Sequence, residues 1–180
     1  MTEEIQDLHE NAEEAHRDPS LTPVTLSMAI LAVLLAAISL LGHRTHTEEL
    51  LLQNKATDQW AYFQAKNIRR HTYELFLDLL SVLNPKDPEA AEKLKEKYGS
   101  EIKRYQDEQQ EIESEARQLE KEVATQQQKG NRFDLGEVCL EVGIVLTSLT
   151  LLTRRKLFWH LGGLAGLVGV AIAASGLWVK

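Results

Sequence analysis

The sequence predicts an all-α membrane protein with three transmembrane helices and a long antiparallel helical hairpin, coiled-coil-like, between the first and the second. Charged residues crowd into residues 1–21 and 43–134 of the 180-residue chain. Three other stretches are nearly free of charge, and each has about the 20 residues that a helix needs to cross a bilayer. The polar segment between the first two stretches is rich in helix formers and has one strong turn signal near its middle.

Residues 1–21 form an acidic tail. They hold seven acidic residues against Arg17 alone, which accounts for most of the chain's net charge of −7. A short helix here would be only weakly amphipathic, and its negative charge is wrong for binding anionic lipid. We therefore expect a tail with little stable structure.

The first predicted transmembrane helix covers residues 22–42. No charged residue occurs between Val24 and Gly42. A secretory signal peptide has a basic flank and a shorter apolar run, whereas this flank is acidic and the run is full length. The pattern favours an uncleaved anchor.

Two further transmembrane helices are predicted at residues 133–153 and 157–179. The basic turn between them, Arg154-Arg155-Lys156, is so short that the two helices must be antiparallel. Dense basic charge in a short loop indicates the cytoplasmic side, which also places the N-terminus in the cytoplasm. Arg44, Lys129 and Arg132 argue for the reverse, but bases in a long loop count weakly.

The hairpin is predicted over residues 43–132. Its outgoing helix has no proline or glycine from His43 to Leu83 and is expected to continue straight out of the first transmembrane helix. The segment Asn84-Pro85-Lys86-Asp87-Pro88 predicts a turn. The return helix is expected from Glu89 to Lys129, with a disturbance at Gly99 and a stop at Gly130-Asn131.

The return helix has the clearest periodicity in the chain. A heptad seam runs through Ile102, Tyr105, Gln109, Ile112, Ala116, Leu119 and Val123. The outgoing helix offers a partner face through Ala56, Trp60, Phe63, Ile68, Leu75 and Leu79. A hairpin of only two helices leaves much of each seam exposed to solvent. We therefore expect subunits to pair through these seams as a homo-oligomer.

Two segments resemble a known bacterial family. They are Asn54–Lys66 (NKATDQWAYFQAK) and Leu152–Lys156 (LTRRK) with Trp159. Both are similar to the family defined by domain of unknown function 4337, and the resemblance extends over nearly the whole chain. It implies a multi-pass protein of the bacterial inner (plasma) membrane and no particular activity.

The sharpest chemical feature is an acidic pair inside the second apolar stretch. Glu137 and Glu141 lie four residues apart on one helix face, and ionised carboxylates at membrane depth are costly and often functional. His43 and Arg44 leave the membrane on the same side and complete a candidate intramembrane polar cluster. Three interpretations stay open: a structural ion pair, an interfacial position if the span begins near Val142, and a polar or proton-conducting path in an oligomer.

Small residues recur in the third stretch at the spacing of one helix face: Gly162, Gly166, Ala165, Gly169 and Ala173. Such spacing lets helix backbones approach closely in lipid, so these residues are candidates for helix packing. A phosphate-binding glycine loop is disfavoured because no strand precedes them.

The aromatic cluster Trp60, Tyr62 and Phe63 lies too far along the outgoing helix for a membrane-interface belt. Packing inside the hairpin is favoured, and docking of a partner protein is the alternative. His43 and His46 alone are too few to hold a metal ion, so we expect none.

The remaining patterns define the functional expectation. No catalytic motif, cofactor motif or basic stripe for nucleic acid occurs in the sequence. The sequence therefore favours a non-enzymatic, oligomeric, membrane-anchored scaffold or accessory subunit, in contact with lipid and with proteins through the hairpin. The alternative is a small channel or transport-related oligomer with an acidic path at Glu137 and Glu141.

Overall fold

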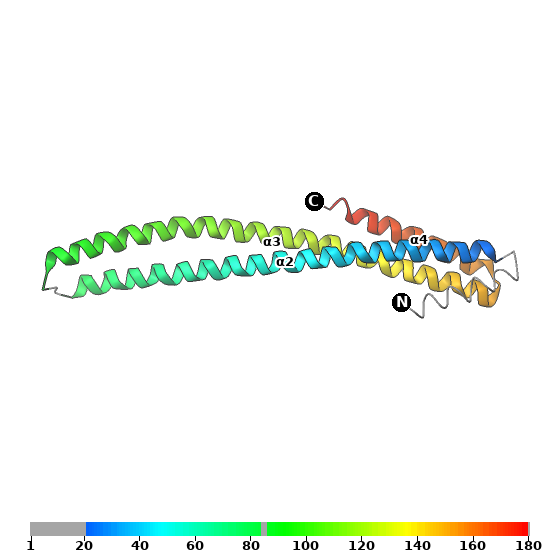
Figure 1. The fold of residues 1–180 in the computed structure, drawn as a ribbon, viewed down its shortest axis with the longest axis horizontal. Helices are drawn as coiled ribbons and strands as arrows, with labels where there is room; N and C mark the ends of the chain where they lie inside the picture. The colour runs from blue at the N-terminus through cyan, green and yellow to red at the C-terminus, as the bar shows by residue number, and fades with distance from the viewer. Residues whose placement is uncertain (1–20, 84–85, 180) are drawn as a thin grey trace. The chain divides into compact units, whose positions relative to one another are not determined.

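The computed structural model describes residues 21–83 and 86–179. This part of the chain contains three helices and no strand: α2 (Thr22–Val82), α3 (Pro88–Thr153) and α4 (Lys156–Gly176) (Figure 1). The all-α prediction is therefore confirmed. Most of the predicted acidic tail, residues 1–20, and Asn84 and Pro85 of the predicted turn lie outside the described residues.

Local chemistry explains where α3 begins. Pro88 occupies its first position, where the missing N–H costs nothing. Asp87 precedes it, and its Oδ1 accepts a hydrogen bond from the backbone N–H of Ala90 at 3.1 Å. This is the arrangement of an N-cap, which satisfies one of the donors that a helix start leaves unpaired.

The predicted stop at Gly130-Asn131 is wrong, because α3 runs through both residues without a break. A glycine inside a helix costs about 1 kcal/mol relative to alanine, yet here it makes room for a neighbour. A Cβ at Gly130 would lie 2.8 Å from Cε1 of His46 on α2. The expected disturbance at Gly99 is also absent from the helix, and no atom lies within 4 Å of a Cβ built there.

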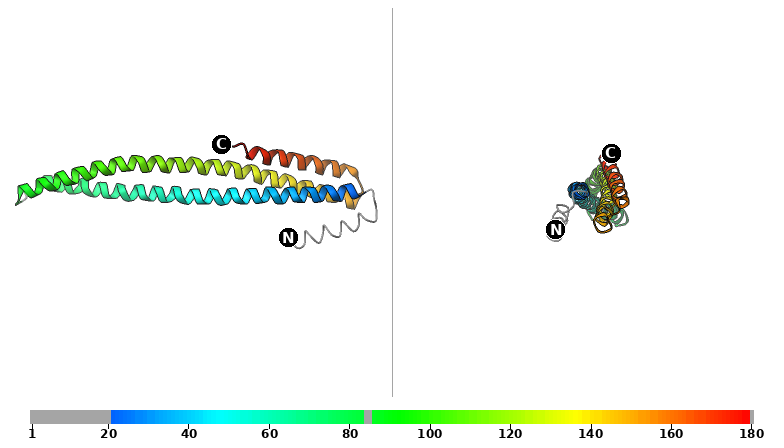
Figure 2. Two further views of the ribbon diagram at one scale, coloured as in Figure 1. Left: turned by 45° about the horizontal axis from the view of Figure 1, so that its top comes forward. Right: turned by 90° about the vertical axis from the view of Figure 1, so that its right-hand side faces the viewer.

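The chain divides into two compact units. Among the described residues the bundle unit comprises 21–48 and 125–179, and the hairpin unit comprises 49–83 and 86–124. In the bundle unit α4 lies beside the first part of α2 and the last part of α3, and in the hairpin unit α2 and α3 lie side by side (Figures 1 and 2). Each of the three helices includes a stretch long and apolar enough to cross a membrane.

The core of the bundle unit joins all three helices. Its buried members are Leu31, Ile38, Phe133, Leu140 and Ala173. A polar bond adds to this core, since Nε1 of Trp159 on α4 donates to Oγ of Ser27 on α2 at 3.0 Å. The bond fixes the orientation of a large amphipathic ring between two helices.

Glycines allow α3 and α4 to pack almost backbone to backbone. Of the five predicted packing residues, Gly162, Gly166, Gly169 and Ala173 are buried and Ala165 is half-buried. Their counterparts on α3, which the sequence analysis missed, are Gly136 and Gly143. A Cβ at Gly136 would lie 2.8 Å from the carbonyl oxygen of Gly169, and one at Gly143 would lie 2.9 Å from that of Gly162. These approaches leave no room for side chains in the contact.

Replacing Gly169 by alanine should destabilise the bundle unit. The new Cβ would lie 2.7 Å from the carbonyl oxygen of Gly136, and backbone cannot move aside cheaply. Overpacking of this kind costs about 1–3 kcal/mol. The free energy of unfolding, measured by denaturant titration of the full chain in detergent micelles, should fall by that amount.

Gly163→Ala on the same helix is the matched control, because no atom lies within 4 Å of its Cβ position. It should leave stability unchanged or raise it slightly through helix propensity. Equal losses in the two variants would contradict a backbone contact at Gly169.

Candidate functional site

The predicted polar cluster does not close in the structure. Glu141 is exposed and Glu137 is half-buried on α3. Nδ1 of His43 donates instead to the carbonyl oxygen of Ser39, one turn back along α2, at 2.9 Å. Among the described residues no ion pair links either glutamate to His43 or Arg44.

A neighbouring pair joins the two helices in their place. Nε2 of His46 lies 3.1 Å from Oδ1 and 3.2 Å from Oδ2 of Asp134. The ring of His46 fits against α3 because Gly130 has no side chain. The spacing of Gly130 and Asp134, one turn apart, is the signal that could have identified this contact. The local pattern at Gly130-Asn131 indicates a helix end instead.

The predicted seam of α3 lies against α2 in the hairpin unit. Tyr105, Gln109, Ile112 and Ala116 are buried, and the other three members are half-buried. Gln109 differs from the other buried members of the seam, because its Nε2 is buried and has no hydrogen-bond partner among the described residues. A single polar residue in a seam can fix the register of paired helices while lowering their stability.

The predicted partner face of α2 is partly wrong. Ile68, Leu75 and Leu79 were expected to face α3, but they are 66%, 61% and 48% exposed. The residues of α2 that are buried or half-buried follow a different heptad register, which we call the inner seam: Leu52, Ala56, Gln59, Phe63, Lys66, Arg70, Tyr73, Leu77 and Leu80.

Polar side chains can occupy the inner seam because α3 supplies partners. Nζ of Lys66 donates to Glu108, and Nε2 of Gln59 donates to Glu115. The Lys66 ammonium also lies 5.0 Å from the ring centre of Tyr105, within the range of a cation–π interaction. The aliphatic part of a lysine can therefore pack as an apolar group while its charge stays paired.

The aromatic cluster is divided between the interior and the surface. Trp60 and Phe63 are half-buried, with ring centres 5.6 Å apart in an edge-to-face arrangement. Nε1 of Trp60 donates to Oε1 of Glu120 at 2.9 Å. Tyr62 is 49% exposed and is the only member of the three left available to a partner.

A second aromatic contact, which the sequence analysis missed, lies nearer the turn of the hairpin. Tyr73 of α2 stacks on Tyr98 and Tyr105 of α3, with ring centres 5.2 and 5.8 Å apart. Hydrogen bonds from Arg69 and Arg104 lower the pKa of Tyr105, against the opposing effect of desolvation. Tyrosine at seam positions of both helices was the available signal.

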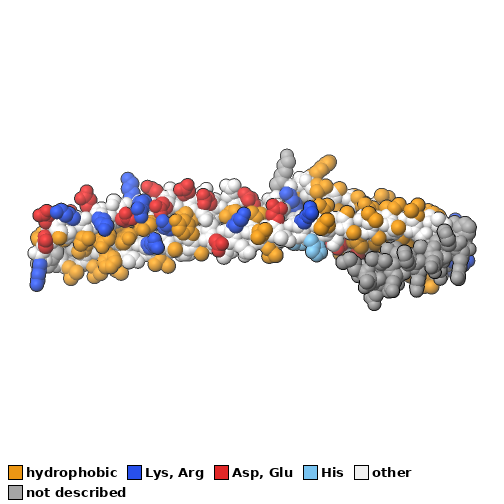
Figure 3. Space-filling model, viewed as in Figure 1, with side chains coloured by type: hydrophobic (Ala, Val, Ile, Leu, Met, Phe, Trp, Pro, Cys, Tyr) orange, Lys and Arg blue, Asp and Glu red, His pale blue; other side chains and the backbone are white. Residues whose placement is uncertain are grey.

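An uncharged face of α2 is uncovered in the hairpin unit. Every member of this face is exposed, and the spacing alternates between four and three residues, so it forms a second heptad register that we call the outer seam: Ala61, Ala65, Ile68, Thr72, Leu75, Leu79 and Val82. None of the seven carries a charge. Figure 3 shows the charged side chains of the hairpin unit gathered over α3, with hydrophobic side chains over α2.

The Lys66–Glu108 pair makes the stability of the hairpin unit depend on pH. The hydrogen bond from Lys66 lowers the pKa of Glu108 below its ordinary value of 4.5. A carboxyl group whose pKa is lower in the folded state stabilises that state above the unfolded pKa and loses this effect as the pH falls through the folded pKa. Glu108→Gln should therefore lower the unfolding temperature by a few degrees near pH 7, and its difference from wild type should shrink as the pH falls below 4.5 and through the lowered pKa of Glu108.

Circular dichroism of the full chain in detergent would measure this difference across pH. Glu111→Gln is the matched control, since Glu111 is an exposed carboxylate of α3 with no ion pair to another described residue. A Glu108→Gln deficit that stayed constant down to pH 3 would show that the loss has another cause than the charge.

The comparisons with known proteins agree with the resemblance drawn from the sequence. A family model described as domain of unknown function, DUF4337, matches residues 20–179. No curated protein and no solved structure matches the chain. The match covers all three helices, and the chain belongs to the DUF4337 family.

Proposed function

We propose that this protein is a membrane-anchored scaffold or accessory subunit whose hairpin unit pairs with that of a second copy of the chain. The observation that carries the proposal is the outer seam of α2. It is a regular heptad of uncharged residues, and nothing in a single chain covers it among the described residues. We propose no catalytic role.

Membrane anchoring rests on the surface of the bundle unit. Large apolar side chains point outward from all three helices, including Val33 (70% exposed), Val145 (59%) and Leu167 (72%). Water would make such a surface costly, whereas lipid tails are the matching solvent. The family membership and the basic turn Arg154-Arg155-Lys156 support the bacterial inner membrane, with this turn and the N-terminus in the cytoplasm.

The outer seam has the geometry of a self-complementary interface. Heptad spacing keeps one stripe facing a partner helix as the two helices wind around each other. A two-fold axis brings the same stripe of two subunits together, as in most homodimers. Two copies anchored in one membrane share the same orientation, so α2 would meet α2 in parallel, with each seam residue beside its own counterpart.

A second copy is also favoured over an unrelated partner by concentration. Molecules confined to one membrane meet at a high effective concentration, which strengthens weak seams. Ala61, Ala65 and Thr72 make this seam modest, so the interaction should depend on anchoring. Tyr62, at the edge of the seam, is the place where a partner protein of other sequence would compete.

Cysteine crosslinking would test this pairing. In a Cys139→Ser background, single cysteines at positions 68, 75 and 82 should each form disulfide-linked dimers in native membranes under mild oxidation. These positions recur every seven residues, so in a parallel pair each lies close to its own copy across the axis. Non-reducing gel electrophoresis measures the dimer fraction.

Ser81→Cys is the matched control, because it is exposed on the same helix beside Val82 but lies off the seam. It should crosslink several-fold less than position 82. Equal crosslinking at 81 and 82 would indicate random collision. If a cysteine at position 68 crosslinked to one at position 79 of the other subunit, and neither crosslinked to its own counterpart, the pairing would be antiparallel. That result would rule out the parallel arrangement.

A channel or transport role is the second candidate. Glu141 favours it, since the carboxylate is exposed on α3 within the apolar stretch and has no ion pair to a described residue. A charge at that depth needs water or a partner from another subunit. In an oligomer, Glu141 would line such a contact.

Glu141→Gln tests this candidate directly. If Glu141 lines a conducting path, proteoliposomes of the wild type should show a proton or cation flux that the variant reduces about tenfold or more. Glu137→Gln, one turn away and half-buried, reports whether the effect is specific to Glu141. Absence of flux in the wild type, or flux unchanged in Glu141→Gln, would exclude the candidate.

A further inference from the structure

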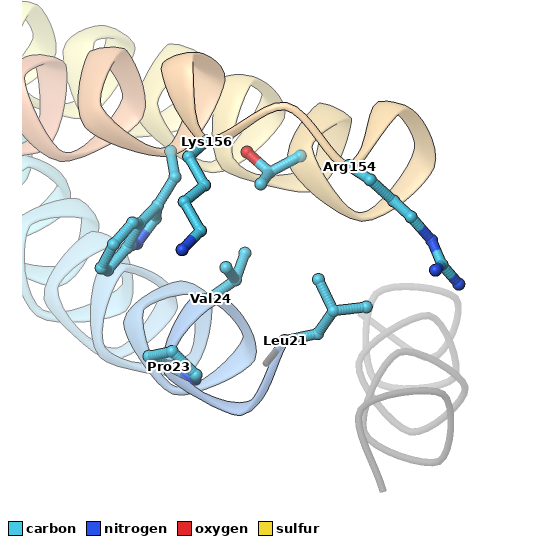
Figure 4. A pocket seen from close by; sticks show the side chains of 7 residues that line it. Leu21, Pro23, Val24, Arg154 and Lys156 are labelled. Atoms are coloured by element: carbon cyan, nitrogen blue, oxygen red, sulfur yellow. The ribbon is translucent and has the colours of Figure 1, made fainter. Parts of the chain in front are cut away.

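A cavity opens in the bundle unit where α3 turns into α4 beside the start of α2. Its volume is about 150 Å³. Cavities of that size hold a molecule with about as many heavy atoms as benzene. Among the described residues its walls include Leu21, Val24, Thr150, Arg154, Lys156 and Trp159, with no acidic side chain (Figure 4).

The cavity has the donors of an anion site. Figure 4 shows Lys156 reaching from the start of α4 into the space above Pro23 and Val24 of α2. Arg154 lies at the outer edge, with its guanidinium directed away from that space. The three bases of the turn raise the local concentration of anions, and Lys156 is placed to contact one inside the cavity.

Thr150 provides an independent indication of a ligand. It is 2% exposed, and its Oγ1 has no hydrogen-bond partner among the described residues. Two other threonines of the same helix, Thr147 and Thr153, each donate to the carbonyl oxygen four residues back at 2.7 Å. Thr150 makes no such bond although it is as buried as Thr147. A buried hydroxyl without a partner is costly, so an acceptor inside the cavity would satisfy it.

An apolar groove lies further along the same three helices. It measures about 270 Å³, and its walls include Ser27, Ile30 and Leu31 of α2 and Gly163, Gly166 and Leu167 of α4. Ser27 lies one turn beyond Val24 on α2 and also accepts the hydrogen bond from Trp159, which lines the cavity. A phosphate-sized cavity that holds Lys156 and Thr150, followed by an open apolar groove, matches a phospholipid, with its phosphate in the first and an acyl chain in the second.

We propose that this cavity binds the phosphate of an anionic phospholipid, with Lys156 and the Thr150 hydroxyl as donors and the groove beside Gly163 holding an acyl chain. The proposal rests on the membrane placement proposed above. In that placement the basic turn lies at the cytoplasmic headgroup layer, where Trp residues also concentrate. Basic pockets between transmembrane helices on this side are a known way of recognising anionic headgroups.

Native mass spectrometry of the full chain in detergent would test the site. The probes are dioleoylphosphatidylglycerol, dioleoylphosphatidylcholine and inorganic phosphate. The wild type should retain one phosphatidylglycerol per chain in preference to phosphatidylcholine. Lys156→Gln and Thr150→Val should each weaken phosphatidylglycerol binding about tenfold, because each removes one charge-assisted hydrogen bond. Lys156→Arg should keep most of the affinity.

The control variants distinguish a specific lipid-binding site from non-specific electrostatic attraction to the basic turn. Arg155→Gln removes the same charge from the same turn, but Arg155 does not line the cavity, so binding should change less than twofold, as expected of an exposed charge. Thr150→Val should leave the unfolding temperature unchanged or higher, since it removes an unpaired buried hydroxyl. Gly163→Leu should weaken lipid binding by filling the groove and should leave inorganic phosphate binding unchanged.

Several outcomes would overturn the proposal. Equal losses in Arg155→Gln and Lys156→Gln would indicate diffuse electrostatics, and an unchanged Thr150→Val would remove the hydroxyl from the site. Inorganic phosphate that displaces the lipid at equal concentration, with no effect of Gly163→Leu, would make free phosphate the ligand. Alkaline carbonate extraction tests the anchoring separately: a chain that stays in the membrane but shows no lipid preference overturns this site alone.

Discussion

Each helix of a two-helix hairpin has one face that its partner can cover, and this constraint governs the hairpin unit. α2 carries two heptad registers, and α3 covers the more polar one. The choice is understandable from the pairs it forms, because Lys66 and Gln59 find Glu108 and Glu115 on α3. The cost is that Ile68, Leu75 and Leu79 remain in solvent. A single hairpin cannot satisfy both faces, so the uncovered face is the reason to expect a second subunit.

The two helices of the hairpin unit differ in how far their contact faces can be predicted from sequence. The seam of α3 could be predicted because apolar residues and burial coincide there, as at Ile112 and Ala116. The face of α2 could not, because a hydrophobicity pattern assigns Lys66 to the outside and Ile68 to the inside. Only the position of acidic partners on the other helix reverses this, and that position depends on the register of pairing. Long basic side chains with apolar stems are the usual source of such errors.

The role of the glycines could be predicted in α4 but not at Gly130 of α3. Gly162, Gly166 and Gly169 could be identified as packing residues because they repeat on one face of an otherwise apolar helix. Gly130 could not, because an isolated glycine before a change in composition has the local appearance of a helix end. Its role depends on the ring of His46, which approaches from a helix more than 80 residues earlier in the chain. An ion pair between Arg44 and the glutamates was one of three interpretations of the polar cluster. It depended on how α2 and α3 align, and in the structure His46 pairs with Asp134.

A buried polar side chain without a hydrogen-bond partner is a stronger sign of a ligand in the bundle unit than in the hairpin unit. Its helices present apolar side chains outward and glycines inward, so few polar partners are available within it. Threonine normally meets this shortage by bonding to its own helix, as Thr147 and Thr153 do. Thr150 does not, and it lines the cavity beside the basic turn. The feature that most needs explanation in the bundle is therefore an unpaired hydroxyl, and a phospholipid phosphate supplies its missing acceptor.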